Sequence, residues 1–389
     1  MRAKRVFLIV LDSVGAGAMP DAKDFGDVGA NTLRSVWSTG KLDIPNLISL
    51  GIGNIDGLDF LDATQTPLAS VARMTERSRG KDTTVGHWEI AGAVSKAPLP
   101  TFPNGFDEDV LKRVRAICGR ELLCNKPYSG TAVINDYGKE AKEKNAVIIY
   151  TSADSVLQLA AQVNGVMELE ELYSACEKLR GELVGEHDGV GRIIARPYIE
   201  DGDGSFKRTE DRRDYSLAPP CTLLPEALKL AGRDSIAIGK IYDIFAGVGF
   251  THAVRTHNNR EGMEQTESFI NKDFEGLCFT NLVDFDMCWG HRRDAEAYAK
   301  GLSEFDLWLG RILPLLREDD VLMITADHGC DPCYIKTTDH TREYTPLLVY
   351  GKNIKPKNFS TRESFSDIAA TVAMMLDISL KTEGSSLEL

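Results

Sequence analysis

The chain has 389 residues, of which 43% are hydrophobic and 26% are charged, as in an ordinary globular protein. Its length exceeds the roughly 250–300 residues at which one hydrophobic core usually stops growing, so we expect two domains. The formal net charge is −13 and no long basic run occurs, which argues against nucleic acid or an anionic membrane as a partner.

The N-terminus begins with basic residues and the apolar run Val6 to Leu11, which is similar to the start of a signal peptide. The run ends at Asp12 without a cleavage site, so we predict a buried first strand instead. No segment reaches the roughly 18 consecutive apolar residues that a membrane span needs. The eight cysteines are scattered, and we therefore expect reduced thiols and a cytoplasmic location.

Short helices are predicted over Asn31 to Trp37 and Pro45 to Leu50. The segment Arg79 to Gly92 follows, and it is dense in groups that carry out chemistry. Thr83 and Thr84 stand where a helix can begin. They are either ordinary N-cap residues or a hydroxyl nucleophile at a helix N-terminus, where backbone N–H groups favour an anion. Spacing alone does not choose between the two threonines.

Prolines then separate a stretch with its own α/β pattern from the rest of the chain. We predict an inserted domain over 98–217 and a core domain made of 1–97 and 218–389. Within the insert, the apolar runs predict strands over 146–150 and 193–195, and helical spacing predicts a helix over 166–184.

After the insert, apolar runs of strand length alternate with amphipathic helical stretches. The predicted strands are 235–240, 277–283, 321–324 and 345–350, and the predicted helices are 262–270 and 298–316. Together with the first strand, this alternation predicts an α/β protein with a doubly wound core sheet.

Three of these strands end in carboxylates, with imidazoles close by. The residues are the carboxylates Asp12, Asp286 and Asp327 and the imidazoles His291, His328 and His340. One such pair alone would equally suit a helix N-cap and a surface histidine. Open α/β sheets bind ligands beyond the carboxyl ends of their strands, so the recurrence favours a metal site there. The six groups suffice for two divalent ions, and the absence of thiolates favours manganese or magnesium over structural zinc.

These motifs resemble those of the phosphopentomutase family, within the alkaline phosphatase superfamily. The segments that carry the resemblance run through the whole chain in order. They are FLIVLDSVGAG and PDA (7–17 and 20–22), GKDTTVGHWEIAG (80–92), NKPYSGT (125–131), YTSADSVLQLAA (150–161), GRIIARPY (191–198), AIGKIYDI (237–244), NLVDFDMCWGHRRD (281–294), ITADHGCDP (324–332) and TDHTREYTPLLVY (338–350). The metal motifs indicate the superfamily, and the Gly-Lys-Asp-Thr segment and the insert motifs indicate the family.

The resemblance implies a core with an inserted α/β cap that recognises substrate. It implies interconversion of ribose 1-phosphate and ribose 5-phosphate, and of the 2-deoxyribose pair, through a phosphothreonine at Thr83 and a 1,5-bisphosphate. It also implies two manganese ions, and priming by glucose 1,6-bisphosphate or ribose 1,5-bisphosphate. One ion would be held by Asp286, His291 and His340, and the other by Asp12, Asp327, His328 and Thr83.

The same resemblance suggests substrate-binding residues. Asp154 would accept hydrogen bonds from sugar hydroxyls, with Ser152 beside it, while Arg192 and Lys240 would face the distal phosphate. Lys81 is a further candidate cation. Each charge is alternatively a solvated surface group or one half of an ion pair. We expect sugar phosphates as the only partners, and a monomer.

Cys330 and Cys333 form a Cys-x-x-Cys beside the ligands, where we expect an asparagine at the first position in relatives. We interpret the pair as incidental rather than as a redox or metal-binding motif. The rival functions are a phosphatase, a phosphodiesterase or a cofactor-independent phosphoglycerate mutase on the same core, or a silent metal-binding module. Thr83 and the YTSAD segment count against the phosphoglycerate mutase, and Thr83 together with all six ligands counts against a silent module.

Overall fold

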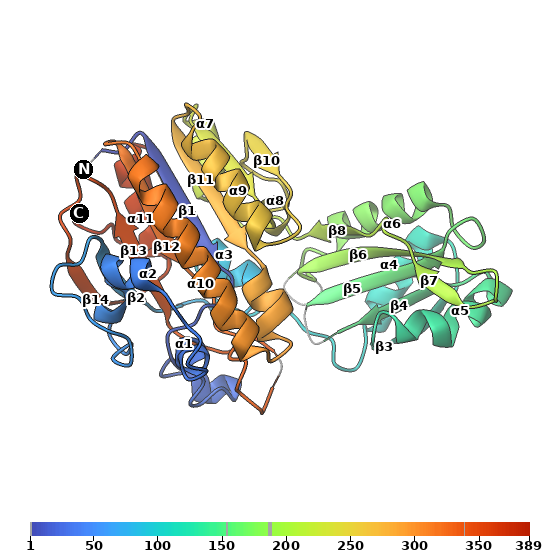
Figure 1. Ribbon diagram of the computed structural model, residues 1–389. Coiled ribbons are helices and arrows are strands. Elements are labelled where there is room, and N and C mark those ends of the chain that lie inside the picture. Colours follow the sequence, from blue (N-terminus) through green and yellow to red (C-terminus); the bar gives the residue numbers. More distant parts are fainter. Residues whose placement is uncertain (1, 153–154, 186–188, 338) are drawn as a thin grey trace. The chain divides into compact units, whose positions relative to one another are not determined.

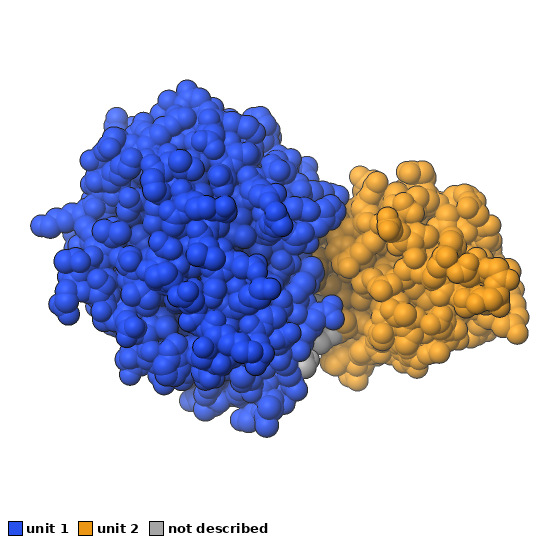
Figure 2. Space-filling view, in the orientation of Figure 1, with its two compact units in different colours: residues 1–98, 219–389 blue, residues 99–218 orange. Residues whose placement is uncertain are grey.

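The structure is a computed structural model that describes residues 2–152, 155–185, 189–337 and 339–389. The chain divides into two compact units, one formed by residues 1–98 with 219–389 and the other by residues 99–218 (Figure 2). Each unit has its own sheet and its own hydrophobic core, as expected for a chain of this length.

The first unit is built on an eight-stranded sheet with the order β10-β9-β11-β1-β12-β13-β2-β14 (Figure 1). The strands on one side of the sheet are parallel to one another, and β13 is antiparallel to both of its neighbours. The strands are β1 (Arg5–Leu11), β2 (Ser70–Met74), β9 (Asp234–Ile238), β10 (His252–Val254), β11 (Gly276–Leu282), β12 (Asp320–Thr325), β13 (Thr345–Tyr350) and β14 (Asn358–Arg362).

Helices cover both faces of this sheet (Figure 1). Phe7, Ile9 and Leu11 of β1 pack into a core that includes residues of α1, α2, α9 and α10, while the alternate residues Val6 and Leu8 are equally buried toward the opposite face. The helices are α1 (Thr32–Trp37), α2 (Pro45–Leu50), α3 (Thr83–Ile90), α7 (Leu224–Leu230), α8 (Ile241–Ile244), α9 (Asn259–Ile270), α10 (Ala295–Ile312) and α11 (Ser366–Met375), with short turns at Ala22–Phe25, Ile52–Asn54, Phe285–Gly290 and Leu313–Leu315.

The register of the three central strands brings their carboxyl ends to one level. Leu11, the last residue of β1, pairs with Leu282, the last residue of β11. Val10 pairs with Thr325, which ends β12. The residues that follow these strands therefore emerge together at one edge of the sheet, where doubly wound proteins bind their ligands.

The second unit contains a sheet with the order β3-β4-β5-β6-β7, and β8 also pairs with β6. One face packs against α4 and α6, and the other against α5. The elements are β3 (Leu122–Pro127), β4 (Val147–Thr151), β5 (Val156–Gln162), β6 (Arg192–Glu200), β7 (Phe206–Arg208), β8 (Arg213–Ser216), α4 (Glu108–Cys118), α5 (Ala132–Lys144) and α6 (Leu169–Glu182).

All eight cysteines lie within the described residues, and all eight are free. Across the ranges that the structure describes, we find no helix that is both long enough and apolar enough to cross a membrane.

Candidate metal centre and nucleophile

Five of the six predicted ligands come after the three central strands, within nine residues of a strand end. Asp12 comes after β1, and Asp327 and His328 come after β12. Beyond β11 the chain forms a π-helical turn, Phe285–Gly290, that carries Asp286 and ends at His291. Such turns are rare and occur frequently at functional sites. This one brings two potential ligands to the edge of the sheet in a single turn of chain.

The sixth predicted ligand, His340, is brought back to this edge by a short backbone bridge. Gly329 and Thr341 exchange two hydrogen bonds of 3.1 and 2.7 Å in an antiparallel bridge, which returns the chain at His340 to the neighbourhood of His328. The rings of His328 and His340 stack with their centroids 4.0 Å apart. The loop between β12 and β13 thereby supplies ligands at both of its ends.

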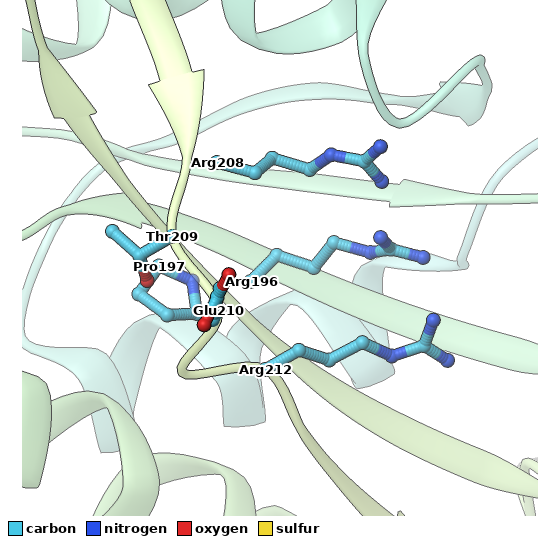
Figure 3. A pocket seen from close by; sticks show the side chains of 6 residues that line it. All are labelled: Arg196, Pro197, Arg208, Thr209, Glu210 and Arg212. Carbon is cyan, nitrogen blue, oxygen red and sulfur yellow. The ribbon is translucent and has the colours of Figure 1, made fainter. Parts of the chain in front are cut away.

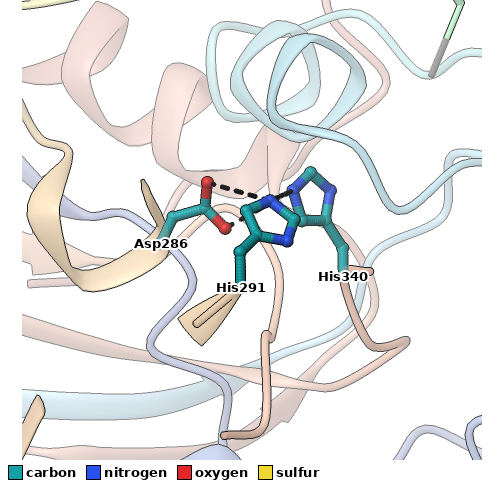
Figure 4. A group of neighbouring side chains, drawn as sticks. All are labelled: Asp286, His291 and His340. Atoms are coloured by element: carbon teal, nitrogen blue, oxygen red, sulfur yellow. Dashed lines mark hydrogen bonds and ion pairs between the residues drawn. The ribbon is translucent and has the colours of Figure 1, made fainter. Parts of the chain in front are cut away.

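One group of side chains consists of Asp286, His291 and His340 (Figure 4). The two carboxylate oxygens of Asp286 lie 3.4 Å from His291 Nε2 and 3.4 Å from His340 Nε2, respectively. The two Nε2 atoms are 3.1 Å apart. Adjacent ligands at right angles around an ion with bonds of about 2.1 Å stand about 3.0 Å apart, so the spacing suits a divalent cation.

A second group surrounds His328. Its Nε2 atom lies 3.4 Å from Asp12 Oδ1 and 3.2 Å from Asp327 Oδ2. Ligand atoms of Asp12, Asp286 and His328 also lie within 4.8 Å of one another. Asp286 is thus common to both groups, and the two candidate ion positions are neighbours. The division of the six residues between two ions stays a prediction.

The three histidines present the same nitrogen to the centre. Nδ1 of His340 lies 2.9 Å from the carbonyl oxygen of Lys81, and Nδ1 of His328 lies 3.1 Å from the carbonyl oxygen of the next residue. Nδ1 of His291 faces the sulfur of Cys330 at 3.9 Å. The two carbonyl oxygens accept hydrogen bonds from Nδ1 of His340 and His328, which leaves the lone pair of Nε2 on each ring for a metal ion.

The carboxylates carry oxygens that the protein leaves without a hydrogen bond. Among the described residues, the buried oxygens without a partner include Asp12 Oδ1, Asp286 Oδ1 and Asp327 Oδ2. Asp327 Oδ2 lies at ion-pair distance from His328, but the angles there are not those of a hydrogen bond. Buried carboxylate oxygens are costly when unsatisfied, and bound cations would satisfy all three. The residues present therefore fit a divalent metal centre.

The pKa values of the group show strong coupling between acids and imidazoles. Burial opposes the charge on Asp286, but His340 and His291 outweigh it and hold the pKa of Asp286 well below its ordinary value. Burial also opposes the charge on His291, yet its contact with Asp286 raises the pKa of His291 to about 11. Around His328 the pattern repeats, because Asp327 raises the pKa of this buried imidazole. In the metal-free protein, protons on the imidazoles of His291 and His328 offset the negative charge of the carboxylates beside them.

Thr83 lies at the edge of the second group. It is the first residue of α3, whose N-cap Asp82 accepts a hydrogen bond from Val85 N at 3.1 Å. The Thr83 hydroxyl lies 3.2 Å from His328 Nε2. A hydroxyl at a helix N-terminus, beside candidate metal ligands, is well placed to carry a phosphoryl group, since the helix dipole favours the added negative charge.

The predicted substrate-binding residues have varied surroundings. Lys81 forms an ion pair of 2.9 Å with Asp27, so its charge already has a partner in the first unit. Lys240 is half-buried at the N-terminus of α8. In the second unit, Arg192 begins β6 and lies 3.7 Å from an oxygen of Asp214. Ser152, directly after β4, is half-buried. Asp154 lies outside the described residues, and the roles of all five stay predictions.

The second unit also holds a basic cavity that the sequence analysis missed. It has a volume of about 620 Å³, and three arginine side chains extend along it in the same direction (Figure 3). Its lining residues are Arg196, Pro197, Arg208, Thr209, Glu210 and Arg212. Burial and the neighbouring charges of Arg212 and Arg208 lower the pKa of Arg196. The three arginines are spread over β6, β7 and the chain before β8, and no local motif joins them.

Comparison with known proteins identifies the class. The family model described as the metalloenzyme superfamily matches residues 4–380, so the chain belongs to this superfamily. The chain aligns over its full length with the phosphoglycerate mutase of Leishmania mexicana, with a TM-score of 0.52, 11% identity and 98% of that chain covered. An alignment with the PH0037 protein from Pyrococcus horikoshii covers 99% of this chain and 100% of that chain, with a TM-score of 0.51 and 12% identity. At these identities the solved structures show a shared fold.

The curated relatives narrow the class to one family. The chain is 53% identical to a phosphopentomutase of Lachnoclostridium phytofermentans over 385 residues, which is 98% of each chain. It is 51% identical to a phosphopentomutase of Acetivibrio thermocellus, again over 98% of each chain. The chain belongs to the phosphopentomutase family.

Proposed function

We propose that the protein interconverts ribose 1-phosphate and ribose 5-phosphate, and the corresponding 2-deoxyribose phosphates, with Thr83 as the group that carries the phosphoryl unit. The observation that supports this most directly is the position of the Thr83 hydroxyl, 3.2 Å from His328 Nε2 and at the first residue of a helix. The same nitrogen lies 3.4 Å from Asp12 Oδ1 and 3.2 Å from Asp327 Oδ2, two buried carboxylate oxygens that lack hydrogen bonds.

In the proposed reaction, Thr83 begins as a phosphothreonine. The 5-hydroxyl of ribose 1-phosphate attacks its phosphorus, the bond from Thr83 Oγ1 to phosphorus breaks, and ribose 1,5-bisphosphate forms. After this intermediate reorients, Thr83 Oγ1 attacks the phosphorus on the C1 oxygen, the bond from that oxygen to phosphorus breaks, and the phosphothreonine is restored. The C1 oxygen takes up a proton in place of the one that the 5-hydroxyl lost, and ribose 5-phosphate leaves. A bisphosphate, such as glucose 1,6-bisphosphate or ribose 1,5-bisphosphate, would load the first phosphoryl group.

Asp12, Asp286, Asp327, His291, His328 and His340 would hold two divalent ions. Oxygen and imidazole ligands suit manganese, and also magnesium. When bound, such ions draw negative charge from phosphoryl oxygens and lower the pKa of a hydroxyl nucleophile. The protein's own contribution is to fix the ligand atoms at separations close to those of a coordination sphere, and to hold Thr83 at their edge.

The net charge of −13 calls for local cations that bind an anionic substrate. Besides the metal ions, the cavity in the second unit offers the guanidinium groups of Arg196 and Arg208, while Arg212 beside them is paired with Asp214. Guanidinium groups bind phosphate through paired hydrogen bonds, so this unit suits recognition of a sugar phosphate.

A coupled assay tests the proposed function. The manganese-loaded protein receives ribose 1-phosphate and a trace of glucose 1,6-bisphosphate, and both ribose 5-phosphate and free phosphate are followed. We expect ribose 5-phosphate without a matching release of phosphate. Release of phosphate without the isomer would show a hydrolase on the same core and would overturn the proposal.

A further inference from the structure

His87 is a buried histidine of α3, one turn after Thr83, to which the proposed reaction assigns no role. Its side chain is fully buried, and both ring nitrogens have close partners. Nδ1 lies 2.8 Å from the carbonyl oxygen of Thr83, and Nε2 lies 3.3 Å from Nδ2 of Asn281, near the end of β11. The ring also stacks on Phe279, with the centroids 6.0 Å apart. Its orientation is therefore fixed from three sides.

These contacts define which nitrogen carries the proton. A carbonyl oxygen only accepts, so Nδ1 of His87 donates to Thr83 and Nε2 keeps its lone pair. The Asn281 amide can donate one hydrogen to that lone pair. It donates the other to Asp12 Oδ2, at 3.0 Å. A chain of hydrogen bonds thus runs from Asp12 through Asn281 and His87 to the backbone of Thr83.

The same imidazole also stands against the third carboxylate of the centre. Its Nδ1 lies 3.1 Å from Asp327 Oδ2, without hydrogen-bond geometry, so that this oxygen stays available to a cation. The preceding residue, Gly86, packs so closely on the strand end that an added Cβ would stand 2.3 Å from the Asp327 carbonyl oxygen. Helix α3 therefore packs tightly against the backbone at Asp327, with no room for a side chain at Gly86.

We propose that His87, held by Asn281, is a positioning residue that sets the distance between the Thr83 hydroxyl and the carboxylates Asp12 and Asp327. It contacts neither a reacting atom nor, in its assigned tautomer, an ion. It acts by tying the first turn of α3 to Asn281 of β11 and, through Asn281, to Asp12 after β1. This inference rests on the proposed role of Thr83, and it adds the residues that give the nucleophile its fixed place.

Two substitutions of His87 distinguish the effect of the hydrogen-bond donor at Nδ1 from the effect of the rest of the ring. In His87→Asn the amide nitrogen takes the place of Nδ1 and can still donate to Thr83 O. In His87→Gln the amide nitrogen takes the place of Nε2, and the donor to Thr83 is lost. His252→Gln is the matched control, because His252 is an exposed histidine of β10 at the outer edge of the sheet.

Each variant is compared in kcat and KM for ribose 1-phosphate, in Mn²⁺ affinity of the metal-free protein, and in thermal unfolding. Displacement of a nucleophile by about 1 Å can cost about 100-fold in rate, so we expect a loss of that order in kcat for His87→Gln. We expect an unchanged KM, a Mn²⁺ affinity weakened by a few fold, and recovery of most of kcat in His87→Asn. Asn281→Ala keeps the donor at Nδ1 and, like His87→Asn, removes the contact at Nε2, so it should lower kcat less than His87→Gln does.

A folded His87→Gln or Asn281→Ala protein with wild-type kcat and wild-type Mn²⁺ affinity would overturn the inference. Equal losses in His87→Gln and His87→Asn would also overturn it, because the donor at Nδ1 would then not be the cause. If the wild type itself forms no ribose 5-phosphate, the proposed function fails. The Mn²⁺ affinities and the rate at which glucose 1,6-bisphosphate phosphorylates Thr83 then still decide whether His87 positions the site.

Discussion

The Nε2 atoms of His291 and His340 lie 3.1 Å apart, although 49 positions separate the two residues in the chain. Two imidazole nitrogens approach this closely at little cost only when a proton or a cation lies between them. The neighbouring oxygens of Asp286, at 3.4 Å from each nitrogen, supply the negative charge that a cation would neutralise. This arrangement is the structural basis for assigning a metal centre to the chain.

Replacement of His340 tests the first group of ligands. His340→Ala removes one nitrogen of the group and leaves the buried Asp286 with one imidazole fewer. We expect it to remove about one equivalent of bound manganese and to lower kcat about 100-fold or more. Metal content by mass spectrometry and the mutase assay measure both effects. His257→Ala, at an exposed histidine, is the control, and full metal content in His340→Ala would contradict the assignment.

Metal affinity should depend on pH in a defined direction. In the metal-free protein the pKa of His291 is raised to about 11 and that of His328 lies well above its ordinary value, so both imidazoles are protonated at neutral pH. A metal ion must displace these protons. Affinity should therefore rise with pH, by about tenfold per pH unit for each proton released. Calorimetric titrations in two buffers of different ionisation enthalpy count the protons, and a titration without proton release would rule out this coupling.

Cys330 has a contact that the sequence did not indicate. Its buried sulfur lies 3.9 Å from Nδ1 of His291, and burial raises the pKa of the thiol to about 12, so it acts as a neutral partner rather than a thiolate. Loss of a group that orients a metal-bound histidine typically costs 10–100-fold in affinity. We expect about 10-fold weaker Mn²⁺ binding in Cys330→Ala and near-complete recovery in Cys330→Asn, whose amide oxygen can accept from Nδ1.

The control for that series is Cys333→Ala, because Cys333 is exposed. Isothermal titration of the metal-free proteins gives the affinities. Equal affinities in the wild type and Cys330→Ala would mean that the sulfur does not orient His291, and that the interpretation of the pair as incidental holds for Cys330 as well.

At the opposite end of the same strands, Arg5 and Asp320 form a fully buried ion pair. The Arg5 guanidinium meets the two carboxylate oxygens at 2.7 and 2.6 Å and also donates to the carbonyl oxygens of Ile270 and Lys272, at and just after the end of α9. Removal of one partner leaves an uncompensated buried charge, so Arg5→Met should lower the free energy of unfolding by about 3–5 kcal/mol. Urea denaturation measures this change.

The exposed pair of Arg2 and Asp377 provides the comparison, with side chains 80% and 62% exposed. Arg2→Met should change the free energy of unfolding by less than about 1 kcal/mol. The double variant Arg5→Met/Asp320→Leu should recover much of the loss, since it removes both buried charges. An Arg5→Met protein as stable as Arg2→Met would show that the buried pair contributes little.

The sequence predicts the central strands and the ligands at their ends because both signals are local. Continuous apolar runs mark β1, β11 and β12, and each run stops at or shortly before a carboxylate. The helix predicted over 298–316 lies instead at Ala295–Ile312 and continues as a 3-10 turn, because Pro314 cannot donate the hydrogen bond that a longer α-helix needs. Caps and prolines shift the ends of an element more easily than they change its type.

Other features have no local signal. The edge strand β14 is polar and partly exposed, with none of the apolar pattern by which buried strands are predicted. The arginines of the basic cavity come from separate segments that the pairing of β6 with β7 and β8 brings together. His87 looks like any other polar residue of its motif until the fold places Asn281 and the Thr83 carbonyl on its two nitrogens. Such contacts depend on long-range packing.

Thr83 is proposed to pass a phosphoryl group to a pentose phosphate, and the transfer of a radioactive label tests this role. The protein is phosphorylated with ³²P-labelled glucose 1,6-bisphosphate, freed of excess reagent, and chased with ribose 1-phosphate. We predict label on Thr83 before the chase and in the pentose phosphates after it. Thr83→Ala should take up no label and should lose about 10⁴-fold or more in kcat, but it should still bind manganese. Thr84→Ala is the control and should behave as the wild type. Label released as inorganic phosphate, or found on a residue other than Thr83, would contradict the account.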